Sequence, residues 1–196
     1  MKNLKYVVCE ATDSFVYGRI NLTQAVKLTN RLSSWASDYE FEEGEVGGET
    51  GGVEEDARQS TITMSKKGLG NTRLCIDKFV REINRNYFKI YYDKLETYQY
   101  TIYSDVNDHY DWHQDYYKDD DEKDFIRTLS MSICLSADDY YRGAEFFIKD
   151  GSERNVRVFK MGLGDFILFP STVEHKVNAL REGERHSLVA WYGYDV

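Results

Sequence analysis

The chain has 196 residues, 41% of them hydrophobic and 30% charged, which is the composition of one ordinary globular domain and not of a disordered segment. Asp and Glu total 34 against 25 Lys and Arg, and the resulting net charge of −9 repels phosphate backbones, so we expect no nucleic-acid partner. No apolar run approaches the ~18 residues of a membrane span, and Tyr6–Cys9 is too short for the core of a signal peptide, so we expect a cytoplasmic protein without membrane contact.

Two stretches in the first half repeat apolar residues at the spacing of an α-helix. Residues Leu22–Tyr39 carry apolar side chains three and four positions apart, and Asn21 or Thr23 is a candidate cap at the start. The same pattern recurs from about Thr72 to Phe88. Between them, Glu40–Asp56 is crowded with glycines and acidic residues, which predicts a flexible loop that is either a solvated linker or a lid over a site.

After Tyr91 the helical spacing gives way to short segments rich in β-branched and aromatic residues, separated by turn signals such as Asp150-Gly151. The predicted strands are Thr97–Tyr103, Thr128–Leu135, Glu145–Ile148, Val156–Phe159, Asp165–Phe169, His175–Ala179 and His186–Trp191. So many short strands predict a mainly β sandwich or barrel with the helices packed outside. We therefore expect one domain over 1–196, with a helical part at 1–90 that includes the acidic loop 40–56, and a β core at 91–196.

The three cysteines, Cys9, Cys75 and Cys134, are far apart and include no Cys-x-x-Cys pair. This spacing argues against both a disulfide framework and a zinc site. We expect all three to be small buried residues.

A candidate metal site begins with His113 and Asp115. If this segment is extended, residues two apart face the same way and bring an imidazole and a carboxylate together. His175 opens a later predicted strand and is the candidate third ligand. Two histidines and one carboxylate form the facial triad of non-haem Fe(II) oxygenases. His109 is an alternative ligand, but the residues around it are typical of a turn, and alternation directs His186 away from the site.

Arg185 follows the Glu182–Glu184 turn, ten residues after His175. An arginine inside a barrel needs an anionic partner, and its planar fork suits a carboxylate. Ser187 would face the same way and could donate a second hydrogen bond. The alternative is an arginine at the rim, paired with Glu182 or Glu184.

Taken together, several segments resemble the prolyl 4-hydroxylase-like family of 2-oxoglutarate and Fe(II)-dependent oxygenases, and most closely its PKHD-type hydroxylases. The similarity runs from about Arg58 to the C-terminus. The matching segments, in order, are Tyr98–Tyr103, His109–Asp115, Arg127–Ser130, Tyr141–Phe146, Gly164–Ser171 leading to His175, and Gly183–Arg185. Ala144 departs from the pattern, because many relatives have glycine there, and we expect it to alter a turn more than the chemistry.

The resemblance implies a double-stranded β-helix, also called a jelly-roll barrel. It makes His113, Asp115 and His175 the ligands of Fe(II), and Arg185 and Tyr103 the partners of 2-oxoglutarate beside Ser187. It places Trp191 and Arg58 on the substrate side, although Trp191 also suits a packing role. Ascorbate is a further candidate cofactor.

The implied reaction is hydroxylation of a C–H bond, with a prolyl residue of a peptide or protein as the expected substrate and with release of succinate and CO2. Three alternatives stay open. The enzyme could act on a free amino acid or another small molecule. It could be a cupin-like metalloenzyme that does not use 2-oxoglutarate. It could also be a jelly roll that binds a ligand without catalysis. The dicarboxylate anchor and the intact ligand set favour the oxygenase.

Overall fold

The computed structural model describes residues 3–44, 57–65, 67–116 and 124–196, and the described part is built from two large sheets, one two-stranded sheet and two helices. The helices are α1 (Leu22–Ala36) and α2 (Gly70–Tyr87). The larger sheet consists, in spatial order, of β1 (Tyr6–Ala11), β2 (Val16–Ile20), β12 (Asp165–Pro170), β8 (Phe125–Cys134), β15 (Arg185–Asp195), β6 (Lys94–Tyr103), β5 (Thr61–Ser65) and β3 (Glu42–Glu43). The smaller sheet consists of β11 (Ser152–Phe159), β10 (Phe146–Asp150), β13 (His175–Val177), β7 (His109–His113) and β4 (Arg58–Gln59). A short pair, β14 (Leu180–Gly183) and β9 (Tyr141–Gly143), lies at one end.

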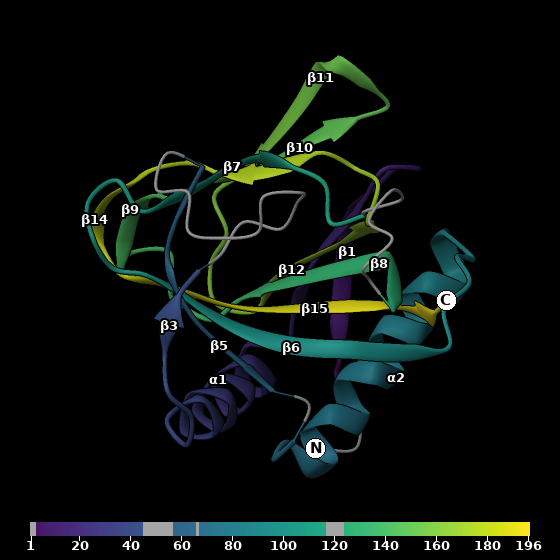
Figure 1. The fold of residues 1–196 in the computed structure, drawn as a ribbon, viewed down its shortest axis with the longest axis horizontal. Helices are drawn as coiled ribbons and strands as arrows, with labels where there is room; N and C mark the ends of the chain where they lie inside the picture. Colours follow the sequence, from purple (N-terminus) through teal and green to yellow (C-terminus); the bar gives the residue numbers. More distant parts are fainter. Residues whose placement is uncertain (1–2, 45–56, 66, 117–123) are drawn as a thin grey trace.

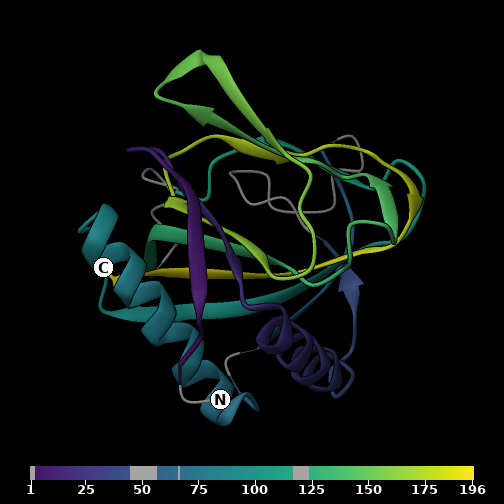
Figure 2. The same ribbon diagram turned by 180° about the vertical axis from the view of Figure 1, so that it is seen from behind.

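The elements form three layers, with the smaller sheet facing one side of the larger sheet and both helices covering its other side (Figure 1). Figure 2 shows the same layers from behind. One apolar core fills the space between the helices and the larger sheet, and a second lies between the two sheets. This arrangement agrees with the mainly β fold and outer helices that the sequence predicts.

The helices form where the apolar spacing predicts them. On α1 the buried side chains include Ala25, Leu28, Leu32 and Trp35, which lie on one face of the helix. Burial of each large apolar side chain contributes roughly 1.5–3 kcal/mol, so this stripe is what holds α1 on the sheet. Asn21 occupies the N-cap position, but its side chain forms no capping hydrogen bond.

Strand β15 is the centre of the larger sheet, since it pairs with β6 on one side and β8 on the other. Its side chains alternate between the two cores. Leu188 and Ala190 pack in the core beneath the helices, whereas Arg185, Ser187 and Trp191 line a cavity between the sheets. Period-two alternation therefore decides which residues of β15 reach the interior.

The N-terminal strands β1 and β2 are not among the strands that the sequence predicts. Strand β1 pairs with β2, and β2 pairs with β12, so the N-terminus extends the larger sheet. The fully buried carboxylate of Asp165 on β12 accepts hydrogen bonds from Arg19 and Tyr17 of β2, which ties this edge together.

Two further predictions concern the burial of the cysteines and the loop 40–56. Cys75 and Cys134 are buried as expected, but Cys9 is exposed, because alternate side chains of β1 face the solvent. Of the predicted loop 40–56, residues 45–56 lie outside the described part, and Glu42–Glu43 pair with β5 as β3.

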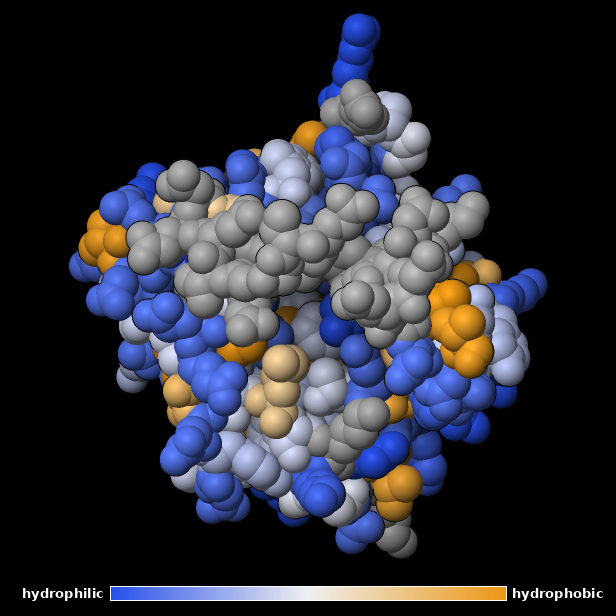
Figure 3. Space-filling view, viewed as in Figure 1, coloured by the Kyte–Doolittle hydropathy of each residue, from blue (hydrophilic) through white to orange (hydrophobic). Residues whose placement is uncertain are grey.

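The surface in Figure 3 is mostly hydrophilic, with hydrophobic side chains scattered singly over the described residues. None of the helices described is long and apolar enough to cross a membrane.

Candidate active site

Three potential metal ligands come together between the two sheets. His113 ends β7, Asp115 follows two residues later, and His175 begins β13 directly opposite His113 in the strand pairing. One ligand atom from each residue lies within 4.8 Å of the others. The Asp115 carboxylate oxygens lie 3.8 Å from Nε2 of His113 and 3.7 Å from Nε2 of His175.

A β-bulge in β7 gives this strand its unusual side-chain directions. His113 pairs with His175, but Tyr110 pairs with Val177, so one extra residue of β7 is accommodated between the pairs. The bulge interrupts simple alternation and lets Tyr110 and His113, three residues apart, both face the cavity. Their rings stack with centroids 3.5 Å apart. Asp111 stabilises the bulge, because its carboxylate accepts a hydrogen bond from the next backbone N–H.

The hydrogen bonds of the two histidines fix which nitrogen faces the metal position. Nδ1 of His113 lies 2.7 Å from the carbonyl oxygen of Asp111, and Nδ1 of His175 lies 3.0 Å from that of Val173. A carbonyl oxygen can only accept, so each Nδ1 donates its hydrogen. Each Nε2 then keeps its lone pair toward Asp115, which is the form of histidine that binds a metal.

The pKa shifts of His113 and Asp115 agree with this assignment of the histidine hydrogens. Burial lowers the pKa of His113 to about 3, and the electrostatic interaction with His175 adds to this effect, so the imidazole of His113 is neutral. Burial alone would raise the pKa of Asp115, but His175, His113 and Arg127 outweigh it, and the net shift of this pKa is downward. Two imidazoles that turn Nε2 toward one carboxylate can bind one face of a metal ion and leave its other coordination positions open, which fits Fe(II).

The buried guanidinium of Arg185 lines the same cavity and lacks a carboxylate partner among the described residues. Arg185 is 1% exposed, and its Nε has no hydrogen-bond partner. The two terminal nitrogens have only distant contacts, 3.5 Å to Oγ of Ser187 and 4.0 Å to Sδ of Met161. A buried cation without an anion is costly, so this pocket fits the carboxylate of a ligand.

The alternative of a rim arginine is excluded by burial and by the partners of the two glutamates. Glu182 pairs with Arg142, and Glu184 pairs with His186. Neither carboxylate reaches Arg185.

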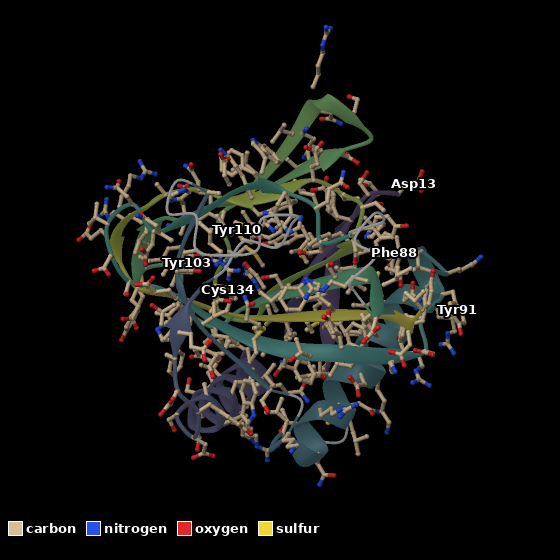
Figure 4. All side chains as sticks on the ribbon, viewed as in Figure 1. Asp13, Phe88, Tyr91, Tyr103, Tyr110 and Cys134 are labelled. Carbon is tan, nitrogen blue, oxygen red and sulfur yellow. The ribbon has the colours of Figure 1, made fainter. Side chains whose placement is uncertain are left out.

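Aromatic and sulfur-containing side chains surround the guanidinium. The ring centroid of Tyr103, which is predicted to border the co-substrate pocket, lies 5.5 Å from Cζ of Arg185. Figure 4 shows Tyr103, Tyr110 and Cys134 gathered between the two sheets. Tyr141 is also buried here and donates its hydroxyl hydrogen to a backbone carbonyl of Met161. From the sequence, Tyr141 stands out only as the first residue of the family-like segment Tyr141–Phe146, with no role of its own.

Both residues assigned to the substrate side line the cavity. Trp191 is 6% exposed, and its indole N–H has no partner. The guanidinium of Arg127 lies 3.9 Å from the Trp191 ring and pairs with Glu96. Trp191 is therefore well packed, yet it keeps an unused hydrogen-bond donor. Arg58 on β4 lies 4.6 Å over the ring of Tyr110.

The remaining histidines and Trp112 lie outside the ligand set. His109 is not among the clustered ligand atoms, and its Nδ1 lies 2.8 Å from the carbonyl oxygen of Asn107. His186 faces the helix side of the sheet, where its Nδ1 lies 2.7 Å from the hydroxyl of Tyr100. Trp112 packs with Phe147 on the outer face of the smaller sheet. The positions of His109 and His186 outside the ligand set agree with the prediction, although His109 lies in strand β7 and not in a turn.

Comparison with known sequences identifies relatives of the β core. A family model described as the 2OG-Fe(II) oxygenase superfamily matches residues 98–193. A PKHD-type hydroxylase of Psychrobacter sp. (strain PRwf-1) is 38% identical over 72 residues, which cover 36% of this chain and 27% of the relative. A PKHD-type hydroxylase of Pseudomonas putida is 37% identical over 67 residues, 34% of this chain and 29% of the relative. The match thus spans less than a third of either relative.

Comparison with solved structures identifies similar folds. A Pseudomonas putida prolyl-4-hydroxylase has a TM-score of 0.71 at 17% identity, over 92% of both chains. A prolyl hydroxylase from Trichoplax adhaerens, solved with a peptide fragment of the hypoxia inducible factor oxygen degradation domain, has a TM-score of 0.71 at 16% identity, over 94% of this chain and 84% of that one. These likenesses confirm the predicted double-stranded β-helix with helices outside.

Proposed function

We propose that this chain, which belongs through residues 98–193 to the 2OG-Fe(II) oxygenase superfamily, is a 2-oxoglutarate-dependent dioxygenase that hydroxylates a prolyl residue of a peptide or protein. One observation carries the proposal. The candidate ligands His113, Asp115 and His175 share a cavity with the buried guanidinium of Arg185, whose Nε has no hydrogen-bond partner and which pairs with no carboxylate among the described residues. A prolyl substrate is supported by the two similar structures, which are prolyl hydroxylases, and a peptide substrate by the one that holds a peptide fragment.

Iron and 2-oxoglutarate, when bound, supply the oxidising chemistry: one atom of O2 enters the substrate as hydroxyl, the other enters succinate, and CO2 leaves. The part of this chain is to hold and orient the reactants. In our proposal the neutral Nε2 atoms of His113 and His175 and the carboxylate of Asp115 bind the iron.

Arg185 then binds the far carboxylate of 2-oxoglutarate through charge-assisted hydrogen bonds. Ser187 lies close enough to the guanidinium to donate to the same carboxylate, and Tyr103 borders the pocket. A cupin-like enzyme without a dicarboxylate co-substrate would have no use for this buried cation, so Arg185 also favours the oxygenase over that alternative.

The walls around the ligands keep water out and leave room for a substrate group. Phe146 and Phe169 pack against the ring of His175, with centroids 5.6 and 4.5 Å away. At the substrate side, Trp191 offers a free indole N–H and Arg58 a cation. A peptide carbonyl next to the reacting residue would satisfy that N–H, because a buried donor without an acceptor is costly.

The test is succinate production by the anaerobically Fe(II)-loaded protein after addition of 2-oxoglutarate and O2. We expect succinate to rise with particular proline-rich peptides, and mass spectrometry to find one added oxygen in those peptides. A rise with free proline but with no peptide would replace the peptide by a free amino acid. No succinate under any condition, despite stoichiometric iron binding, would overturn the oxygenase proposal.

A further inference from the structure

A pair of charged side chains from the two strands beside β15 covers the indole of Trp191. The guanidinium carbon of Arg127 on β8 lies 3.9 Å from the centroid of the indole ring. The Nε and Nη2 atoms of Arg127 donate hydrogen bonds to the two carboxylate oxygens of Glu96 on β6, at 2.5 and 3.1 Å. Because β15 lies between β8 and β6, the ion pair reaches across β15 at Trp191 (Figure 1). We call this pair the Arg127–Glu96 clamp.

Two β-bulges lie at this level of the sheet, one on each side of β15. On β6, the register with β15 shifts between Trp191 and Tyr192, and Glu96 is the extra residue. On β8, the register shifts one residue later, before Gly193, which pairs with Arg127. Bulges re-aim side chains and are frequent next to active sites. The clamp is therefore built from two irregular points of the sheet, both beside the cavity.

Stability alone is a weak reason for the clamp. The side chains of Arg127 and Glu96 are 22% and 26% exposed, and partly exposed ion pairs contribute little to folding. Trp191, in contrast, lines the cavity and is buried, and its indole N–H has no partner among the described residues. A buried donor without an acceptor is costly. The clamp thus fixes a ring whose polar atom the fold itself does not use.

We propose that Arg127 and Glu96 are positioning residues that hold the Trp191 indole in the orientation in which its N–H binds the peptide substrate. The second side-chain torsion of a tryptophan is broad, so a contact on the ring face is needed to select one orientation. The guanidinium supplies this contact by cation–π attraction, and the carboxylate fixes the guanidinium through two parallel hydrogen bonds. The inference rests on the proposed function, because the peptide is the substrate proposed there.

The test measures peptide binding without turnover. Proline-rich peptides are titrated by calorimetry into the full chain loaded with Fe(II) and 2-oxoglutarate, without O2, and the tightest binder is then used for every variant. Arg127→Met and Glu96→Met should each bind it about 3–10-fold more weakly, which is the contribution of one neutral hydrogen bond. Arg127→Lys should recover part of the loss, because it keeps a cation that can reach both the ring and Glu96.

Glu96→Met separates the clamp from the metal centre. It keeps the charge of Arg127, which lowers the pKa of Asp115, so the affinities for Fe(II) and 2-oxoglutarate should stay those of the wild type. During turnover, KM for the peptide should rise in this variant while kcat and KM for 2-oxoglutarate remain constant. Adding Glu96→Met to Trp191→Phe should weaken peptide binding no further, because the clamp acts through the indole N–H.

Lys149→Met is the matched control, because Lys149 repeats the arrangement at a tryptophan outside the cavity. Its Nζ lies 5.4 Å from the ring centroid of Trp112 and pairs with Glu174 at 2.5 Å, and its side chain is 22% exposed, like that of Arg127. The peptide affinity of Lys149→Met should be that of the wild type.

Several results would overturn the proposal. These are wild-type peptide affinity in both Arg127→Met and Glu96→Met, a further loss when Glu96→Met is added to Trp191→Phe, or an equal loss in the Lys149→Met control. Should Arg127→Met fail to fold, as judged by circular dichroism, Arg127→Lys and Glu96→Met decide the matter. Peptide binding that depends on the clamp, in a protein that forms no succinate with O2, refutes the oxygenase and supports the clamp. Wild-type protein that binds no peptide refutes the peptide substrate and the clamp together.

Discussion

Replacing Arg185 with methionine should have opposite effects on stability and on co-substrate binding. Without a ligand, the guanidinium is a buried charge whose Nε has no partner. Exchange of a buried ionic group for an apolar one of similar volume is neutral to stabilising, by up to roughly 4 kcal/mol. We therefore expect Arg185→Met to be as stable as the wild type or more stable in the absence of ligand. Each kcal/mol gained should raise Tm by about 2–4 °C in a domain of this size.

When 2-oxoglutarate is bound, the wild type should be more stable than Arg185→Met. Loss of one partner of a buried charge pair costs about 2–5 kcal/mol, which corresponds to a roughly 30-fold to several-thousand-fold weaker affinity. Thermal unfolding of the Fe(II)-loaded protein under anaerobic conditions, across a range of 2-oxoglutarate concentrations, measures both effects. The wild-type Tm should climb with ligand concentration, whereas that of Arg185→Met should stay flat over the same range.

Arg181→Met is the matched control, because the side chain of Arg181 is 70% exposed and pairs with Glu145 at the surface. Its stability should change by no more than about 0.5 kcal/mol, and its response to 2-oxoglutarate should remain that of the wild type. The reasoning would be refuted by an Arg185→Met variant that is clearly less stable without ligand and yet responds normally to 2-oxoglutarate.

Three further predictions concern the ligands, the substrate side and a turn. His113→Ala and Asp115→Ala should each abolish Fe(II)-dependent succinate formation, and full activity in either would defeat the ligand assignment. Trp191→Phe removes the free indole N–H, so it should raise KM for the peptide substrate while KM for 2-oxoglutarate stays constant; equal changes in both would indicate general damage instead. Gly143→Ala should lower Tm by several degrees, because Gly143 has φ +80° and a Cβ there would lie 2.3 Å from a backbone oxygen. Gly151→Ala, with φ +74° but no atom within 4 Å of the added Cβ, should cost less, and a larger loss there would contradict the steric argument.

Patterns of local periodicity were enough to predict the elements around the site. The spacing of apolar residues predicted α1 and α2 to within a few residues, and alternation predicted that His186 faces away from Arg185. The sequence left open whether Arg185 lies inside the barrel or at its rim, and the structure shows that it is buried. These predictions succeed because each depends on side-chain direction within one strand or helix.

The features that were missed depend on contacts between distant segments. The pairing of β2 with β12 joins residues far apart in the chain, and the short segment Val16–Ile20 gives no local sign of it. The contact between Ser130 and Ser171 is equally invisible, because serines suit turns, strands and surfaces alike. The bulge in β7 also has no clear signal in the sequence around Asp111. Long-range register, and the hydrogen bonds that follow from it, had to come from the structure.

The central position of β15 limits how this protein can change over evolution. The proposed co-substrate anchor and the candidate substrate residue, Arg185 and Trp191, are six residues apart on one strand, so the strand spaces them by about 20 Å of contour. An insertion or deletion between them would turn the following side chains to the opposite face, exchanging the lining of the site with the core under the helices. We therefore expect β15 to tolerate substitutions but neither insertions nor deletions. New substrate preferences are expected to arise from length changes in the segments that connect the strands.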